Sequence, residues 1–357
     1  MPHRRPTLAK RASRPAAALA ALGAAALTVP LATPAAAAGE AYVALGDSYS
    51  SGVGTRTYLN DGSSCLRSPY AYPSLIASAR SYALNFRACS GATVADVTNS
   101  QLSALTASTA YVTLSVGGND AGFAGVLTTC AQPSWLSNCM RAIDGAQGYI
   151  NSTLPSRLDA LYANIRSRSP QAQVTIVGYP RLFNGEDCSW LTWFSGTEMS
   201  RLNQTADLLN SRLASAAAAR GFAFANPTSP FLGHAVCDNQ EWINGLSWPV
   251  VESFHPKVAG QVSGYTPVVS TYVGGSSLRV TAAIKREARA SAGAQAALQR
   301  RYRAADATIT PKSFRAPDLT TPRAKAAAAR AGVDLNSRAS IDAADRRYAA
   351  AQERAYR

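Results

Sequence analysis

The sequence predicts an α/β fold in which a parallel sheet is covered by helices. From Gly39 onward, short runs of β-branched and aromatic residues alternate with longer stretches rich in alanine and leucine, which is the pattern of repeated strand and helix units. The expected strands are 41–45, 82–87, 111–116, 173–178 and 222–225, and the expected helices are 70–79, 94–107, 139–168 and 197–220. Pro155 falls inside the third helix, where it is expected to start or kink a helix.

The first 38 residues have the composition of a secretory signal peptide. Five basic residues precede an apolar run from Ala16 to Ala32, and a small-residue cleavage site, Ala36-Ala37-Ala38, comes directly before Gly39. A transmembrane anchor is disfavoured because the run is mostly alanine and is interrupted by Gly23 and Pro30. We therefore expect an exported, extracellular bacterial protein.

The net charge of +14 is concentrated at the two ends of the chain. Residues 39–278 carry 13 basic and 14 acidic side chains, whereas residues 279–357 carry 17 basic and seven acidic ones. Because nucleic-acid binding needs clustered basic residues, the nearly neutral central part is not expected to bind nucleic acid.

The composition changes again beyond Gly274 and predicts a C-terminal extension. Residues 279–305 and 323–357 are rich in alanine and arginine, which favours helices around a proline-containing linker at 306–322. Alanine faces bury little apolar area, so we expect a loosely structured basic appendage, with adhesion to anionic lipid or cell wall as the functional alternative. The expected parts are a signal peptide (1–38), a folded domain (39–275) and the extension (276–357).

Six cysteines, an even number in an exported chain, are expected to form disulfides. Six cysteines allow fifteen pairings, and the sequence alone does not choose among them. Closeness along the chain favours three pairs: Cys65 with Cys89, Cys130 with Cys139, and Cys188 with Cys237. No Cys-x-x-Cys is present and the histidines are isolated, so neither a metal nor a cofactor is expected.

Four short motifs carry residues suited to nucleophilic catalysis. Gly46-Asp-Ser48 follows the first strand, Gly91 lies in Ala-Cys-Ser-Gly-Ala-Thr, Asn119 lies in Gly-Gly-Asn-Asp, and His255 lies in Glu-Ser-Phe-His-Pro. A serine needs a base within hydrogen-bond reach and donors for the oxyanion. Each motif alone is equally consistent with turn chemistry. Their order, with three of them just after predicted strands where α/β sheets bind ligands, favours a catalytic set.

Together these motifs resemble the SGNH, or GDSL, hydrolase family over roughly residues 40–273. The resemblance implies a three-layer α/β/α flavodoxin-like domain with a central parallel sheet of about five strands. It implies Ser48 as nucleophile and His255 as base, with an oxyanion hole formed by the Ser48 and Gly91 backbone amides and the Asn119 side chain. Related secreted members also pair their cysteines sequentially. The Gly-x-Ser-x-Gly signature of α/β-hydrolases is absent.

The third catalytic residue is the point where the sequence departs from the family. The family usually has aspartate three residues before its histidine, and here that position is Glu252. We interpret Glu252 as the residue that orients His255, with the backbone carbonyl of Ser253 as the alternative. Asp47, Asp120 and His234 are interpreted as structural.

The expected function is a secreted lipase, esterase or phospholipase that cleaves lipid acyl esters through a Ser-His acyl-enzyme mechanism. A long loop after the fourth strand carries an aromatic cluster, which is either a lipid-facing surface or a cap on the core; its members are Trp190, Leu191, Trp193 and Phe194. The alternatives are a carbohydrate acetylesterase and, from a different class, a surface-binding protein that uses its basic tail. The expected partner is a lipid or other ester substrate, and the expected state is a monomer.

Overall fold

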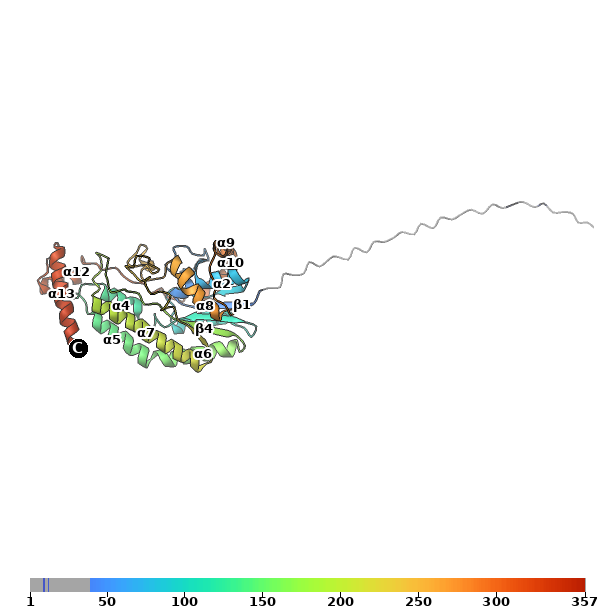
Figure 1. The fold of residues 1–357 in the computed structure, drawn as a ribbon, viewed down its shortest axis with the longest axis horizontal. Helices are drawn as coiled ribbons and strands as arrows, with labels where there is room; N and C mark the ends of the chain where they lie inside the picture. Colours follow the sequence, from blue (N-terminus) through green and yellow to red (C-terminus); the bar gives the residue numbers. More distant parts are fainter. Residues whose placement is uncertain (1–8, 10–11, 13–38, 357) are drawn as a thin grey trace, which may run out of the picture. The chain divides into compact units, whose positions relative to one another are not determined.

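The computed structural model of this chain describes residues 9, 12 and 39–356. Two compact units divide the chain, and all elements discussed below belong to the second unit, which begins at residue 38 (Figure 1). The expected signal peptide therefore lies outside the described residues, apart from two isolated positions. Within the described residues, no helix has the length and apolar character that crossing a membrane would require.

A single five-stranded parallel sheet forms the centre of the fold, as the sequence predicts. The strands are β1 (Ala41–Gly46), β2 (Ala83–Phe86), β3 (Tyr111–Ser115), β4 (Gln173–Val177) and β5 (Ala223–Ala225). Their order is β2-β1-β3-β4-β5, which is the flavodoxin-like arrangement with its topological switch point between β1 and β3. The residues of β1 and β3 are almost all buried, because helices cover both faces of the sheet.

Helices form the two outer layers (Figure 1). One layer contains α2 (Tyr72–Arg80) and α8 (Thr266–Tyr272), and the other contains α5 (Cys139–Ser152), α6 (Leu154–Arg168) and α7 (Gly196–Ala219). Pro155 lies in the first turn of α6, so it starts a helix as expected, since its missing amide proton is not needed there.

Two short helices differ from the expectations. The helix expected at 94–107 is only α3 (Val94–Asp96), followed by a π-helical turn (Val97–Gln101) and a 3₁₀ turn (Leu102–Ala104). Helix α4 (Phe123–Cys130), which is not among the expected helices, follows the Asn119 turn. Helix α1 (Ser48–Ser51) is a single turn directly after β1.

The three disulfides are the pairs that closeness along the chain favours. Cys65 and Cys89 are 24 positions apart, Cys130–Cys139 joins the end of α4 to the start of α5, and Cys188 and Cys237 are 49 positions apart. Each bond limits the freedom of a loop in the unfolded chain, more so for the longer loops. The bonds therefore fix loops that follow β2, β3, β4 and β5.

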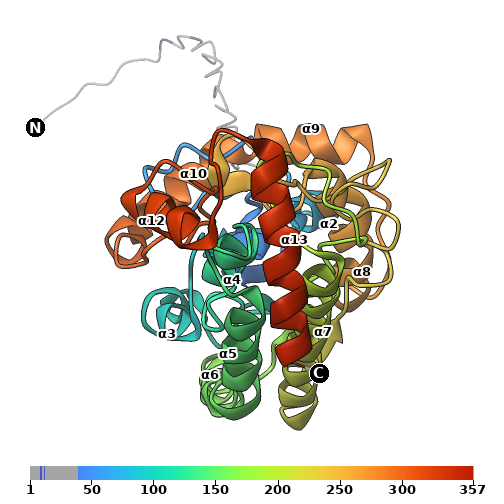
Figure 2. The same ribbon diagram turned by 90° about the vertical axis from the view of Figure 1, so that its left-hand side faces the viewer.

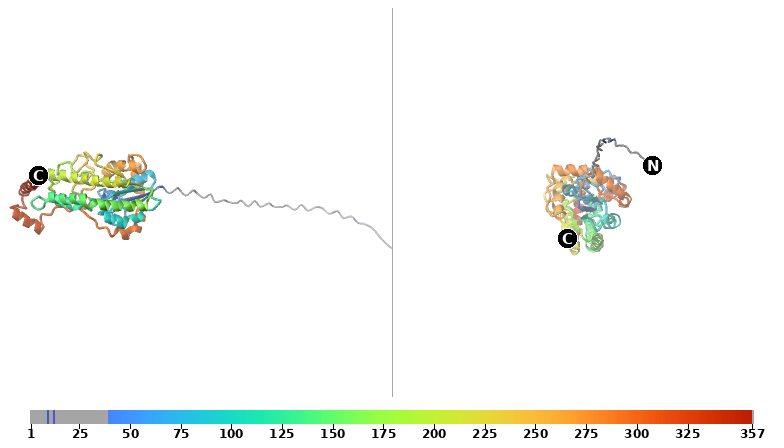
Figure 3. Two further views of the ribbon diagram at one scale, coloured as in Figure 1. Left: turned by 90° about the horizontal axis from the view of Figure 1, so that it is seen from below. Right: turned by 90° about the vertical axis from the view of Figure 1, so that its right-hand side faces the viewer.

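The C-terminal extension is helical, as predicted, but it is packed rather than loose. Its helices are α9 (Ala282–Ala290), α10 (Ala292–Gln299), α11 (Arg303–Asp306), α12 (Pro322–Ala331) and α13 (Arg338–Ala355). Helix α9 packs on α2, and α10 packs on the edge strand β2. Figures 2 and 3 show the extension following the domain from α9 to α13.

A buried ion cluster explains why the first half of the extension is held so firmly. Asp306 accepts hydrogen bonds from Arg67 at 2.9 Å and from Arg87 at 2.8 Å. Both arginines are fully buried, and Arg67 also pairs with Asp61 at 2.7 Å. Arg87 in addition lies over the ring of Tyr302, 4.0 Å from its centroid. Two cations and two anions thus neutralise one another out of water, which a buried charge requires.

The second half of the extension covers the loops that follow β3 and β4. Figure 2 shows α13 lying in front of α4 and α5. The Nε1 of Trp193 donates to Asp342 at 3.0 Å, and the backbone amide of Ser134 donates to Asp345 at 2.7 Å. Trp135 and Trp193 form a small hydrophobic cluster with residues of α12 and α13. The expectation of a loose appendage was wrong, because hydrogen bonds and tryptophan contacts with the domain hold the extension although its alanine faces bury little apolar area.

Replacing Asp306 with asparagine is expected to lower the free energy of unfolding by about 3–5 kcal/mol, because buried Arg87 would lose its carboxylate partner and buried Arg67 would keep only Asp61. Urea denaturation at neutral pH measures the change. The matched control is Asp159→Asn, which removes the partner of Arg220 in an exposed pair and should cost about 0–1 kcal/mol. Equal effects of the two substitutions would contradict the structural role of Asp306.

Candidate active site

The turn after β1 depends on glycine at position 46. Gly46 has φ +123°, and a Cβ there would lie 2.4 Å from the carbonyl oxygen of Ser115 on the neighbouring strand. The side chain of Gln101 holds this peptide from both sides, accepting from Gly46 N at 2.7 Å and donating to Gly46 O at 2.9 Å. The chain can therefore turn sharply at the carboxyl end of β1 and present Ser48 at the start of α1.

The carboxylate of Asp47 fixes this turn. One oxygen accepts from the backbone amide of Tyr49 at 3.0 Å and from the hydroxyl of Ser115 at 2.7 Å, and the other accepts from the hydroxyl of Tyr179 at 2.6 Å. Burial raises the pKa of Asp47 to about 6, although these hydrogen bonds favour the charged form and oppose the shift. Asp47 caps α1, whereas the hydrogen bonds of the His255 ring go to Ser253 and Ser48, which fits the structural interpretation of Asp47.

Ser48 and His255 form the central pair of the site. The Oγ of Ser48 lies 2.8 Å from Nε2 of His255, and Nδ1 of the same ring lies 2.9 Å from the carbonyl oxygen of Ser253. A carbonyl oxygen can only accept a hydrogen bond, so Nδ1 carries the proton and Nε2 is free to accept from the serine hydroxyl. This is the nucleophile and base geometry that serine catalysis requires.

The carboxylate of Glu252 does not orient His255, which corrects the first of the two sequence interpretations. Glu252 is buried and accepts a hydrogen bond from the hydroxyl of Tyr58 at 2.5 Å. Its second oxygen has no partner among the described residues. Phe254 has φ +59°, and this left-handed turn aligns the Ser253 carbonyl with the ring while Glu252 turns inward. The alternative of a backbone carbonyl at Ser253 is the observed arrangement.

The three expected oxyanion donors follow β1, β2 and β3. The backbone amides of Ser48 and Gly91 donate to no other group within the described part of the chain. The side-chain nitrogen of Asn119 donates to the carbonyl of Ala92 at 3.0 Å, which leaves its second proton available. Asp120 accepts from the backbone amide of Val94, a contact that fits its structural interpretation.

A mainly apolar cavity of about 60 Å³ adjoins the Ser48–His255 pair. It is lined by Asn119 and by apolar side chains that include Phe123, Leu127, Ile150, Leu182 and Leu209. Two further lining residues, Lys312 and Phe314, come from the C-terminal extension. The sequence reasoning missed both of them; its one signal was a single aromatic residue within the linker at 306–322.

In the aromatic loop after β4, some side chains cap the core and another faces solvent, so each of the two interpretations fits part of the loop. Trp193 and Phe194 are buried, and Phe194 packs on Phe183 and Phe254. Trp190, in contrast, is 75% exposed.

His234 stacks on Trp242 with ring centroids 3.7 Å apart, and its Nδ1 lies 2.7 Å from a backbone carbonyl. These contacts fit the structural interpretation of His234, and His255 remains the candidate base.

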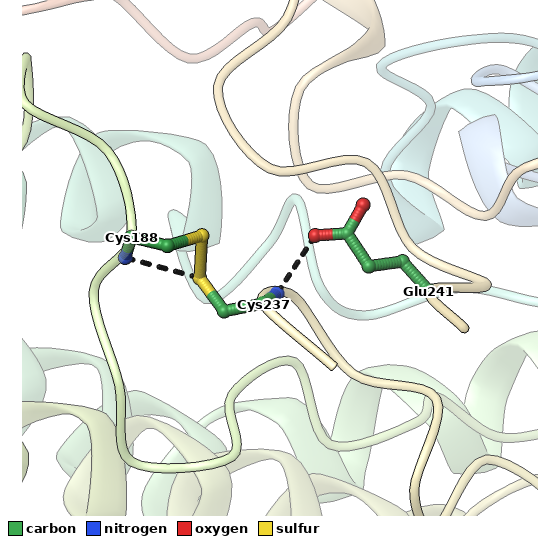
Figure 4. A group of neighbouring side chains, drawn as sticks. All are labelled: Cys188, Cys237 and Glu241. Atoms are coloured by element: carbon green, nitrogen blue, oxygen red, sulfur yellow. Dashed lines mark hydrogen bonds between the residues drawn. A yellow bond between two sulfur atoms is a disulfide. The ribbon is translucent and has the colours of Figure 1, made fainter. Parts of the chain in front are cut away.

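Figure 4 shows Cys188, Cys237 and Glu241, whose donor atoms lie close enough together to resemble a metal site. The two sulfurs are joined in a disulfide, and zinc-type ligation needs thiolates. The Glu241 carboxylate accepts from the amide of Cys237 at 2.8 Å and from the ammonium of Lys257 at 2.6 Å. This cluster is a structural brace between two loops.

Burial lowers the pKa of His255 to about 4, and the hydrogen bond from Nδ1 to the Ser253 carbonyl partly offsets this shift. The imidazole is therefore neutral at pH 7. A neutral ring can accept the proton of the Ser48 hydroxyl, which a protonated ring cannot do.

Comparison with known proteins finds a matching family and similar solved structures. The GDSL-like lipase/acylhydrolase family matches residues 44–262. Lipase 1 of Streptomyces coelicolor is 46% identical over 248 residues, covering 69% of this chain and 90% of that protein. Among solved structures, phospholipase A1 from Streptomyces albidoflavus NA297 aligns with a TM-score of 0.62 and 43% identity, covering 66% of this chain and 100% of that one. The extracellular lipase of Streptomyces rimosus aligns with a TM-score of 0.61 and 42% identity, covering 65% and 98%.

The His255 imidazole is expected to titrate near pH 4 in an NMR pH titration, with His255→Ala to identify its resonances. Between pH 6.5 and 4 the unfolded chain binds a proton that the folded protein does not. This group's contribution to the free energy of unfolding is therefore complete above pH 6.5 and is lost as the pH falls toward 4. A midpoint near 6.5 would show that burial does not control the ring.

Proposed function

The chain belongs to the GDSL-like lipase/acylhydrolase family, and we propose that it is a secreted serine hydrolase that cleaves the acyl esters of lipids. The observation that carries this proposal is the 2.8 Å contact between Ser48 Oγ and His255 Nε2 beside an apolar cavity. The paired hydroxyl and neutral imidazole suit nucleophilic attack on an ester, and the cavity suits an acyl chain.

In the proposed first step, His255 takes the proton of Ser48 as Oγ attacks the ester carbonyl carbon. The tetrahedral intermediate then collapses, the bond to the leaving alcohol breaks, and His255 returns the proton to the alcohol oxygen. Water enters next and gives a proton to His255 while its oxygen attacks the acyl carbon. Collapse of the second intermediate returns that proton to Ser48 and releases the acid.

The oxyanion of both intermediates would be held by the backbone amides of Ser48 and Gly91 and by the side chain of Asn119. Two of these donors are unpaired within the described residues, and the third keeps one free proton. Preorganised donors of this kind are typically each worth about 10²–10³ in rate.

The Ser253 carbonyl is the proposed positioning group for the base. It holds the proton on Nδ1, so Nε2 faces Ser48. The hydroxyl of Tyr49, next to the nucleophile, donates to the carbonyl of Phe254, next to the base, at 2.8 Å. This bond keeps the nucleophile turn and the histidine loop in register.

The substrate proposal rests on the apolar lining and on relatives that are described as lipases and a phospholipase A1. A carbohydrate acetylesterase remains the alternative and would favour a polar cleft beside a small acyl pocket. The surface-binding alternative is weakened because several basic residues of the extension bind the domain itself, among them Arg289, Arg300 and Arg338. Other exposed arginines of α13, such as Arg346 and Arg347, remain available for contact with anionic lipid.

The proposal of secretion rests on the signal-peptide composition of residues 1–38 and on the three disulfides. Disulfides persist in oxidising compartments and are rare in the cytosol. We propose that the mature chain acts outside the cell as a monomer.

Hydrolysis of p-nitrophenyl esters from acetate to palmitate tests the proposed function. The purified mature protein is expected to cleave acyl chains longer than acetate, and Ser48→Ala is expected to abolish the activity because no other nucleophile replaces the hydroxyl. Activity on acetate alone would favour the carbohydrate esterase, and equal rates in both proteins would exclude Ser48 as nucleophile.

Glu252→Gln is expected to keep kcat/KM on the best ester within a few-fold of wild type, because Glu252 binds Tyr58 and not the His255 ring. Steady-state kinetics at neutral pH measure the effect. The control is Asn119→Ala, which should lower kcat by about 10²–10³ if its amide holds the oxyanion. A comparable loss in Glu252→Gln would restore the carboxylate as the orienting group.

A further inference from the structure

The C-terminal extension crosses the candidate active site. Residues Thr310–Arg315, here called the strap, connect α11 to α12 without helical structure. A Cβ on Gly91 would lie 2.6 Å from the carbonyl oxygen of Thr310 and 2.8 Å from the backbone nitrogen of Lys312. The strap backbone thus packs closely against Gly91, the residue whose amide is one of the three expected oxyanion donors.

The strap continues past the other parts of the site. The ammonium of Lys312 lies 3.5 Å from the carbonyl oxygen of Asn119. The ring of Phe314 is 4% exposed and meets the ring of Phe254 edge-on, with centroids 4.9 Å apart. The backbone amide of Arg315 then donates to the hydroxyl of Thr128 on α4 at 2.9 Å.

The strap is fixed on both sides. Before it, Asp306 belongs to the buried ion cluster, and Ile309 is 2% exposed in the main core. After it, α12 and α13 pack on the cluster that contains Trp135 and Trp193. Because the strap is held at both ends and two of its residues line the cavity, it forms one wall of that cavity.

The size of the cavity shows what this wall does. With Phe314 seated, the cavity beside Ser48 measures about 60 Å³, whereas sites for larger ligands usually measure about 300–1,000 Å³. We propose that Phe314 is a specificity-determining residue, whose ring limits the length of the acyl chain that the site accepts. It lies outside residues 44–262, where the family matches, so the extension adds this restriction to the family's own site.

This inference rests on the proposed ester hydrolysis at Ser48. Phe314→Ala is expected to raise the ratio of kcat/KM for p-nitrophenyl laurate over butyrate by about tenfold or more, since each accommodated methylene can contribute a factor of that order. Phe314→Trp is expected to lower the same ratio. A merely structural role would reduce both rates in parallel and leave the ratio unchanged.

The matched control is Leu319→Ala. Leu319 is a partly buried residue of the extension that packs on the cluster around Trp135 and Trp193 and does not line the cavity. Its ratio should equal that of wild type. An unchanged ratio in Phe314→Ala, or an equal change in Leu319→Ala, overturns the inference while wild-type ester hydrolysis upholds the proposed function.

A binding measurement decides the inference without turnover. In the Ser48→Ala background, calorimetry with butanoate and dodecanoate is expected to show a dodecanoate affinity at least about tenfold higher after Phe314→Ala, with little change for butanoate. No gain for dodecanoate overturns the role of Phe314, even if the wild type proves inactive on esters and the proposed function fails.

Discussion

The carboxylate of Asp47 joins the carboxyl ends of three neighbouring strands. It accepts from Tyr49 beyond β1, from Ser115 at the end of β3 and from Tyr179 beyond β4. A buried carboxylate is costly unless donors surround it, so these three groups are held at fixed distances around one point. The turn that carries Ser48 and the end of β3 are both held at this point, and Tyr179 also lines the cavity beside Ser48.

The extension belongs to the same folding unit as the domain, because it supplies a carboxylate that two buried arginines of the domain require. Arg67 and Arg87 lie in the domain, but the carboxylate that neutralises both comes from Asp306 in the extension. Separation of the two parts would uncover these arginines and the edge strand β2, which α10 now covers. Removal of everything beyond residue 275 would therefore alter the core as well as the site.

The imidazole of His255 is oriented by a neutral group, and this affects its pKa. A carboxylate beside Nδ1 would favour the imidazolium, whereas the Ser253 carbonyl offers only a dipole. Burial then dominates and lowers the pKa of His255 to about 4. The ring stays neutral and able to accept a proton over a wide pH range. In the proposed mechanism, the imidazolium would be stabilised by the Ser253 carbonyl and by the oxyanion beside it.

The sequence by itself determined the local features. Alternating strand and helix patterns predicted the five strands, Pro155 marked the start of α6, and motif order brought Ser48, Gly91, Asn119 and His255 together as candidates. These features follow from periodicity and turn chemistry, which act over a few residues. Within one short turn, however, the sequence could not decide between the Glu252 carboxylate and the Ser253 carbonyl, because a single backbone dihedral at Phe254 selects one of them.

Only the tertiary structure decided the contacts between distant segments. The alanine-rich composition of residues 276–357 predicted helices but not their packing. That packing depends on contacts between residues far apart in the chain, such as Asp306 with Arg67 and Asp342 with Trp193. The position of Phe314 at the cavity could not be predicted for the same reason. Sequence patterns show which face of an element is apolar, whereas the partner of that face depends on how the whole chain folds around its core.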